Sequence, residues 1–138
     1  QAIVPTTDRT FLNPSIAIDG RGAIHLVERR NGYSEVDETT NASGAWMTSR
    51  LFGVAGSAVP FAAFDPSGRL VVAAQESYGE AVTLGIRPAG GSLAWTAVTA
   101  VGDLSGLAIG ADGSPLVAFS RIAQPGGASR TWLARSPP

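Results

Sequence analysis

Two short polar segments of this chain repeat the same pair of side chains at the same spacing. Tyr33-Ser-Glu35 and Tyr78-Gly-Glu80 lie 45 residues apart. A tyrosine offers a ring face and a hydroxyl, and a carboxylate accepts hydrogen bonds through two coplanar oxygens. Arginine, asparagine, glutamine and glutamate residues precede the two tyrosines. The segments therefore suit a polyol such as a sugar; the alternative is that the tyrosines cover strand edges and bond to the backbone.

The three tryptophans are the other side chains on which a sugar ring could stack. Trp46 and Trp95 each open an apolar stretch at equivalent places, and Trp132 lies near the C-terminus. Equivalent placement favours packing between neighbouring structural units, with ligand stacking as the alternative. The candidate ligand-binding residues are Arg29, Asn31, Tyr33, Glu35, Gln75, Glu76, Tyr78, Glu80, Trp46, Trp95 and Trp132.

The sequence offers few side chains for metal binding or nucleophilic catalysis, because the chain has one histidine and no cysteine. His25 lies within an apolar stretch, and the equivalent positions hold Val71 and Leu116. We therefore expect a packed strand residue, with a ligand contact as the alternative. A zinc site would need carboxylates as its remaining ligands, and none has suitable spacing. We expect no catalytic residue, no metal and no cofactor.

A cluster of carboxylates in the segment EVDE is the best candidate for acid–base chemistry. Glu35 and Asp37 are two residues apart, and residues i and i+2 of a strand share a face. Glycoside hydrolysis needs two carboxyl groups about 5–10 Å apart around a pocket. The simpler interpretation, which we prefer, is a solvated outer strand.

All of these residues lie within three copies of one unit. The copies begin PSIAIDGRGAIHLVE, VPFAAFDPSGRLVVAA and LSGLAIGADGSPLVAFS. Gly22 and Gly68 are 46 residues apart, and Gly113 follows 45 residues later. A tight turn that ends in one of these glycines joins two apolar strands, so we expect positive φ at all three. The third copy has Gly110 where the others have aspartate, so its turn must be held differently.

Further strands complete each unit. Third strands are expected at 34–40, 80–87 and 130–135, and fourth strands at 45–52 and 94–101. The third unit has no fourth strand of its own, and residues 1–12 have the matching interval before the first unit. The first two strands of each unit are almost continuously apolar, which is typical of sheets buried on both faces.

The units resemble β-propeller repeats of the bacterial lectin-like, sialidase-like and NHL-like kinds, which have an apolar–Asp–x–x–Gly–x–apolar core. The resemblance implies an all-β fold of three four-stranded antiparallel blades. The chain would be a single domain, with blades at about 13–58, 59–103 and 104–138 and an N-terminal strand at 1–12.

Three blades are too few for a ring, since propellers have four or more. We expect two chains to close a six-bladed ring, in which each N-terminal strand completes the last blade of the partner. A longer protein or three chains in a nine-bladed ring are the alternatives.

Composition limits the partners. The net charge is −1, which leaves no basic surface for nucleic acid or anionic lipid. No apolar run approaches the length of a membrane span. None of the ten basic residues is lysine, a bias that indicates a bacterial, G+C-rich genome. The N-terminal sequence lacks a signal peptide and fits either a mature or a trimmed start; we take a secreted or extracellular location as the working expectation.

The expected function is a non-enzymatic, lectin-like carbohydrate-binding module, because repeated sites on a ring raise avidity for multivalent glycans. Its partners would be a second copy of the chain and a glycan. A catalytically silent scaffold or protein-interaction propeller is one alternative. A fragment of a larger propeller enzyme is another, although no acid–base set supports it.

Overall fold

The computed structural model describes residues 11–30, 35–53, 59–75, 80–122 and 129–137. Every regular element in these residues is a β-strand, and no helix that could cross a membrane occurs in them. The strands are β1 (Phe11–Ile18), β2 (Ile24–Arg30), β3 (Glu35–Thr40), β4 (Met47–Gly53), β5 (Phe61–Phe64), β6 (Leu70–Gln75), β7 (Val82–Arg87), β8 (Ala94–Thr99), β9 (Asp103–Ile109), β10 (Pro115–Ile122) and β11 (Ser129–Arg135).

These strands form three antiparallel sheets, each ordered as in the sequence. Sheet 1 is β1-β2-β3-β4, sheet 2 is β5-β6-β7-β8, and sheet 3 is β9-β10-β11. The predicted all-β class and the strand positions within each repeat are confirmed. Strand β1 begins at Phe11, which pairs with Arg30, so the last two residues of the expected N-terminal strand 1–12 belong to sheet 1. Residues 1–10 lie outside the described part of the chain.

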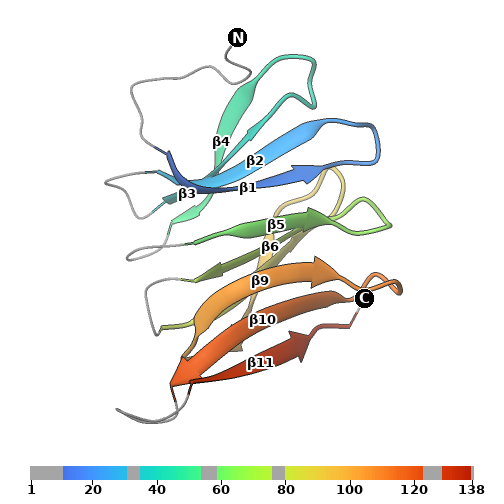
Figure 1. The fold of residues 1–138 in the computed structure, drawn as a ribbon. Helices are drawn as coiled ribbons and strands as arrows, with labels where there is room; N and C mark the ends of the chain where they lie inside the picture. The colour runs from blue at the N-terminus through green and yellow to red at the C-terminus, as the bar shows by residue number, and fades with distance from the viewer. Residues whose placement is uncertain (1–10, 31–34, 54–58, 76–79, 123–128, 138) are drawn as a thin grey trace.

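The three sheets are stacked face to face, with sheet 2 in the middle (Figure 1). Strand β6, with the sequence LVVAAQ, is buried along its whole length. Its alternate side chains enter two different apolar clusters. Leu70 and Val72 pack with Val27 and Val36 of sheet 1, whereas Val71 packs in the cluster shared with sheet 3. Burial on both faces explains why the strand is continuously apolar, as the sequence predicted.

The β1–β2 and β5–β6 turns are built alike. In the first, the amide of Gly22 donates to the carbonyl of Asp19 over 3.0 Å, and the Asp19 carboxylate accepts from the amides of Arg21 and Ala23. In the second, the Asp65 carboxylate accepts from the amide of Ser67 in the same way. The predicted positive φ is confirmed in all three repeats, with values of 84°, 80° and 82° at the closing glycines.

The third turn uses a different acceptor, as its glycine at the first position required. Asp112 accepts hydrogen bonds from the amide and hydroxyl of Ser114, and its other partner is Arg135. A Cβ atom on Gly110 would lie 2.8 Å from Asp112 Oδ1. In the third turn the carboxylate is that of Asp112, two positions later than the aspartate of the other two turns. The absence of a Cβ atom at Gly110 leaves room for it.

The outward faces of the two outer sheets carry exposed apolar side chains. Ile16 and Ile18 are 65% and 61% exposed, and they alternate with buried Ala17 on β1. Leu133 on β11 is 68% exposed, next to Ala134, which packs toward sheet 2. Exposed apolar side chains therefore lie on the outward faces of both outer sheets, although Glu28 and Asp37, which strand alternation places on the outward face of sheet 1, are buried.

Candidate functional site

A polar hollow lies between sheets 1 and 2, at the end of the sheets where the β1–β2 and β5–β6 turns lie. Its volume is about 680 Å³. It lies among the turn residues of both sheets and the β7–β8 link. Among the residues that line it are Asp19, Arg21, His25, Phe64 and Arg87.

A buried carboxylate organises one wall of this hollow. Glu38 on β3 is 2% exposed. Arg87 at the end of β7 donates to both of its oxygens, over 2.6 Å each. His25 Nδ1 lies 2.7 Å from Glu38 Oε1. The β2–β3 register pairs His25 with Thr40 and Val27 with Glu38, so His25 and Glu38 are diagonal neighbours on the face toward sheet 2.

The pKa of the Glu38 carboxyl is the balance of two opposing effects. Burial raises it, but the hydrogen bonds from Arg87 and then His25 outweigh burial and hold the pKa below its ordinary value. Since an ionised carboxylate can only accept, His25 Nδ1 carries the proton of their shared hydrogen bond. The network therefore fixes the imidazole tautomer at Nδ1.

The other nitrogen of His25 is directed toward the turn. Its Nε2 is buried and has no hydrogen-bond partner among the residues that the structure describes. It lies 3.8 Å from Asp19 Oδ2, which is too far for a direct hydrogen bond. The ring of Phe64 packs edge-on against the imidazole, with centroids 4.7 Å apart. His25 is thus a packed strand residue, as the sequence predicted, and also part of a polar site.

Asp19 completes the site with a second ionised carboxylate. The hydrogen bond from the amide of Ala23, helped by that from Arg21, lowers the pKa of Asp19 below its ordinary value. One of its oxygens is used by the turn, and the other is the oxygen nearest His25 Nε2. The rim of the hollow therefore presents a carboxylate oxygen, with the exposed Arg21 beside it.

This arrangement can bind hydroxyl groups, and neither of its two carboxylates is suited to act as a general acid. A general acid must hold a proton near the operating pH, whereas Asp19 and Glu38 both have lowered pKa values. Burial raises the pKa of Glu28, but by strand alternation Glu28 lies on the opposite face of β2. Within the described residues, no three His, Asp or Glu side chains cluster in a way that could hold a metal ion.

The sequence-predicted site residues do not gather at this hollow. Four of them, Asn31, Tyr33, Glu76 and Tyr78, lie outside the described residues. Arg29, Glu35, Gln75 and Glu80 lie at the opposite ends of their strands or in the adjoining links. Trp46 precedes β4, where it is half-buried, and Trp132 on β11 is 50% exposed.

Three predicted site residues make specific contacts within the protein. Gln75 is buried, and its amide donates to the carbonyl of Gly102 and accepts from the amide of Leu104. Glu35 forms an ion pair with the exposed Arg50. Trp95 packs between sheets 1 and 2, with its ring centroid 4.0 Å from that of Phe52, which is the packing role that its repeat position favoured.

The preferred interpretation of the EVDE segment as a solvated outer strand is wrong. Asp37 and Glu38 are 0% and 2% exposed. Strand β3 is the third of four, so it pairs with neighbours on both sides, and sheet 2 covers the face that carries Glu38. A usable signal was present in His25, because a histidine in an apolar strand needs a buried polar partner.

No protein-family model matches this chain, and no curated protein matches its sequence.

Proposed function

We propose that the chain is a non-enzymatic carbohydrate-binding module of the propeller type, and that the polar hollow between sheets 1 and 2 is its glycan site. The observation that carries the proposal is the preorganised wall of His25 and Arg87, which Glu38 holds in place, with Asp19 fixed beside it by the hydrogen bonds of its own turn. A site whose polar groups are fixed by buried hydrogen bonds loses little entropy when a ligand binds.

A neutral polyol fits the hollow better than a charged ligand. Arg87 is already paired with Glu38, and the Asp19 carboxylate lies beside His25 and Arg21. With these charges balanced inside the protein, hydroxyl groups that both donate and accept are the matching ligand chemistry. The Phe64 ring adds an apolar surface for the C–H face of a sugar.

Glycan binding by the full chain tests this proposal. An array identifies a bound glycan, and calorimetric titration then compares Asp19→Asn with Arg50→Ala. Asp19→Asn keeps an oxygen that can accept the turn hydrogen bonds but removes the charged acceptor at the hollow. We expect it to weaken binding roughly tenfold, the effect of losing one charge-assisted hydrogen bond. Arg50→Ala, a change to an exposed arginine outside the hollow, should have no effect.

The two candidate binding sites, the polar hollow and the Tyr33 and Tyr78 segments, give different results in the same titration. If the Tyr33 and Tyr78 segments bind the glycan, Tyr33→Ala and Tyr78→Ala weaken binding and Asp19→Asn does not. An array without hits would favour the second candidate, a catalytically silent scaffold. The exposed apolar faces of sheets 1 and 3 support that candidate, because such faces are typical of protein interfaces.

We also propose that the three sheets are propeller blades and that a second copy closes a six-bladed ring. Sheet 2 supports this, because both of its faces are covered by neighbouring sheets. Sheets 1 and 3 each have one such face uncovered. In the proposed ring, the outward face of sheet 1 packs against sheet 3 of the partner. The mass in solution should then be twice the 14.1 kDa of one chain.

A further inference from the structure

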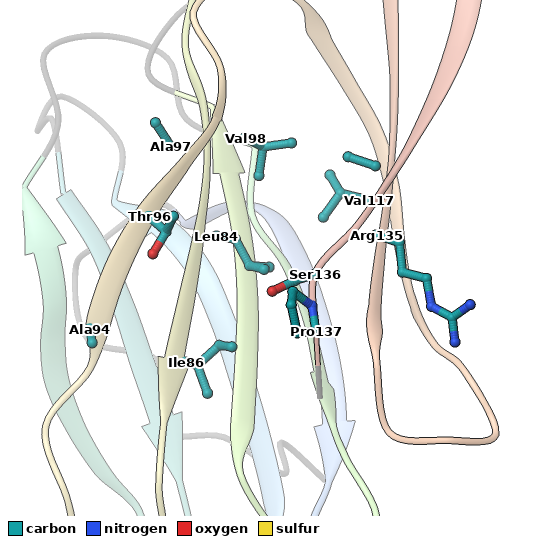
Figure 2. A pocket seen from close by; sticks show the side chains of 11 residues that line it. Leu84, Ile86, Ala94, Thr96, Ala97, Val98, Val117, Arg135, Ser136 and Pro137 are labelled. Atoms are coloured by element: carbon teal, nitrogen blue, oxygen red, sulfur yellow. The ribbon is translucent and has the colours of Figure 1, made fainter.

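A second hollow, lined mainly by apolar residues, lies between sheets 2 and 3. Its volume is about 370 Å³. Leu84 on β7 and Val98 on β8 face it from sheet 2, and Val117 on β10 faces it from sheet 3 (Figure 2). The chain segment after β11, at Ser136 and Pro137, borders the same space (Figure 2).

The contact between sheets 1 and 2 explains why this hollow exists. There, the outermost strands of the two sheets meet: Phe52 at the end of β4 packs against Trp95 on β8. Sheet 3 has β11 as its outermost strand in the described part of the chain. The other face of β8, with Ala94, Thr96 and Val98, therefore lines open space.

The free edge of β11 borders the hollow. Strand β11 pairs with β10 along Ser129–Arg135, and among the described residues no strand pairs with its other edge. A free edge presents unpaired backbone N–H and C=O groups that can bind another strand. The edge supplies backbone hydrogen bonds, and the hollow has room for side chains of an added strand.

We propose that the β11 edge and this hollow together accept a β-strand formed by residues 1–7 of a second copy of the chain. The inference rests on the proposed ring and specifies how its two copies are joined. It predicts one acceptor and one donor in each copy, so two identical exchanges close the assembly.

The repeat period identifies the donor. Asp19 and Asp65 begin equivalent turns 46 residues apart, and β4 spans Met47–Gly53. Residues 1–7 therefore precede the Asp19 turn by the same interval by which β4 precedes the Asp65 turn. They read QAIVPTT, with the apolar residues Ile3 and Val4. Pro5 is compatible with this role, because an outermost strand is the place in a sheet that tolerates proline.

The same period identifies the side chain that fills the hollow. Trp95 precedes Gly110 by 15 residues, and Val4 precedes Asp19 by 15 residues. Trp95 is the β8 side chain that packs toward the preceding sheet. The hollow lies on the corresponding side of sheet 3, so Val4 is the donor residue that enters it.

The reach of the chain requires a second copy. Stacked sheets are roughly 10 Å apart, so sheet 3 lies roughly 20 Å from sheet 1 of the same chain, across sheet 2 (Figure 1). Residues 8–10 would link the donor strand to β1. The four Cα–Cα steps from residue 7 to residue 11 span at most about 14 Å. Residues 100–102 are a link of the same length between adjacent sheets. The donor strand can therefore join an adjacent sheet, and in the ring that sheet is sheet 3 of the partner.

Crosslinking of two single-cysteine variants tests the proposal, because the chain has no cysteine of its own. Val4→Cys and Thr96→Cys are unfolded, mixed, refolded together and treated with a short bismaleimide; Thr96 is exposed and lines the hollow. We expect a denaturation-resistant product of twice the chain mass. Val4→Cys mixed with Ser43→Cys, an exposed position in the β3–β4 link, should give several-fold less.

Two outcomes would overturn the proposal. One is the absence of a dimeric product above the Ser43→Cys control from variants whose circular dichroism matches that of the parent. The other is an intramolecular crosslink in the double variant Val4→Cys/Thr96→Cys, which would place the donor in its own chain. The mass of the uncrosslinked protein separates this failure from that of the ring. A dimer without the crosslink keeps the ring and rejects this acceptor, whereas a monomer rejects both.

Discussion

At the scale of single residues, the network around Glu38 shows how one buried charge positions a whole surface. A carboxylate that is 2% exposed would be costly without partners. Arg87 and His25 provide them, from a different sheet and a different strand. The same contacts fix the imidazole orientation and bring the Arg87 guanidinium to the hollow, so the fold and the proposed binding site depend on the same hydrogen bonds.

The lowered pKa of Glu38 predicts a pH dependence of stability. Because its pKa in the folded protein is below the ordinary value of 4.5, its stabilising effect is fully present above that value and is lost as the pH falls through and below it. Glu38→Gln should lower the free energy of unfolding by about 2 kcal/mol at pH 7. Urea titrations at several pH values should show this difference shrinking toward pH 3.

A matched variant controls for the loss of any glutamate in β3. Glu35 pairs with Arg50, which is 60% exposed, and exposed pairs contribute about 1 kcal/mol or less. Glu35→Gln should therefore have a small effect on unfolding at pH 7. An equal loss of stability in the two variants would contradict the central role of Glu38.

At the scale of elements, the β1–β2 turn offers a test of backbone strain without a change in packing. Gly22 has φ of 84° and Gly20 is outside the left-handed region, yet a Cβ atom at either position meets no other atom within 4 Å. Gly22→Ala should cost about 1–2 kcal/mol of unfolding free energy from its φ alone. Gly20→Ala should be neutral or slightly stabilising. Thermal unfolding of the two variants compares them, and equal melting temperatures would contradict a strain-based cost.

The strands and turns could be predicted because their signals are local. Segments such as DGRG and DPSG combine an aspartate that binds its own turn with a closing glycine, and apolar residues flank them. The period of 45–46 residues then located equivalent strands. Even the altered third turn was expected from Gly110, although its solution, the shift of the carboxylate to Asp112, depends on contacts with Ser114 and Arg135.

The polar hollow could not be predicted in the same way. His25 and Glu38 are 13 residues apart and meet through the β2–β3 register, while Arg87 lies 49 residues beyond Glu38 and meets it through sheet packing. Neither relation follows from composition or spacing within one repeat. His25 itself indicated that a buried polar partner was needed, but its apolar equivalents, Val71 and Leu116, gave no sign of which residue that partner would be.

At the scale of the whole molecule, the stacking of three sheets leaves the chain with two unlike ends. One end is the face of sheet 1 with Ile16 and Ile18, and the other is the face of sheet 3 with Leu133. Because the faces differ, contact between them is head-to-tail, and two copies can close such contacts only if each copy uses both faces. The proposed six-bladed ring satisfies this condition, whereas a contact between two sheet 1 faces would leave both sheet 3 faces exposed.

A pair of equally exposed residues can test this assembly. Ile18 and Met47 are both 61% exposed in a single chain. Ile18 lies on the outward face of sheet 1, whereas Met47 pairs with Thr40 on the face that carries His25. In the ring, Ile18→Asp buries an unpaired charge between two blades, which costs about 3 kcal/mol or more. The dissociation constant of the dimer should therefore rise by roughly 100-fold.

Met47→Asp introduces the same charge at the same exposure but outside the contact, so its dimer should dissociate as the parent does. Sedimentation velocity over a concentration series measures both variants, and circular dichroism checks that each remains folded. Equal dissociation constants would mean that the outward face of sheet 1 is not covered by a partner. A selective loss of the Ile18→Asp dimer is the expected result, because only the outward face of sheet 1 would meet sheet 3 of the second copy.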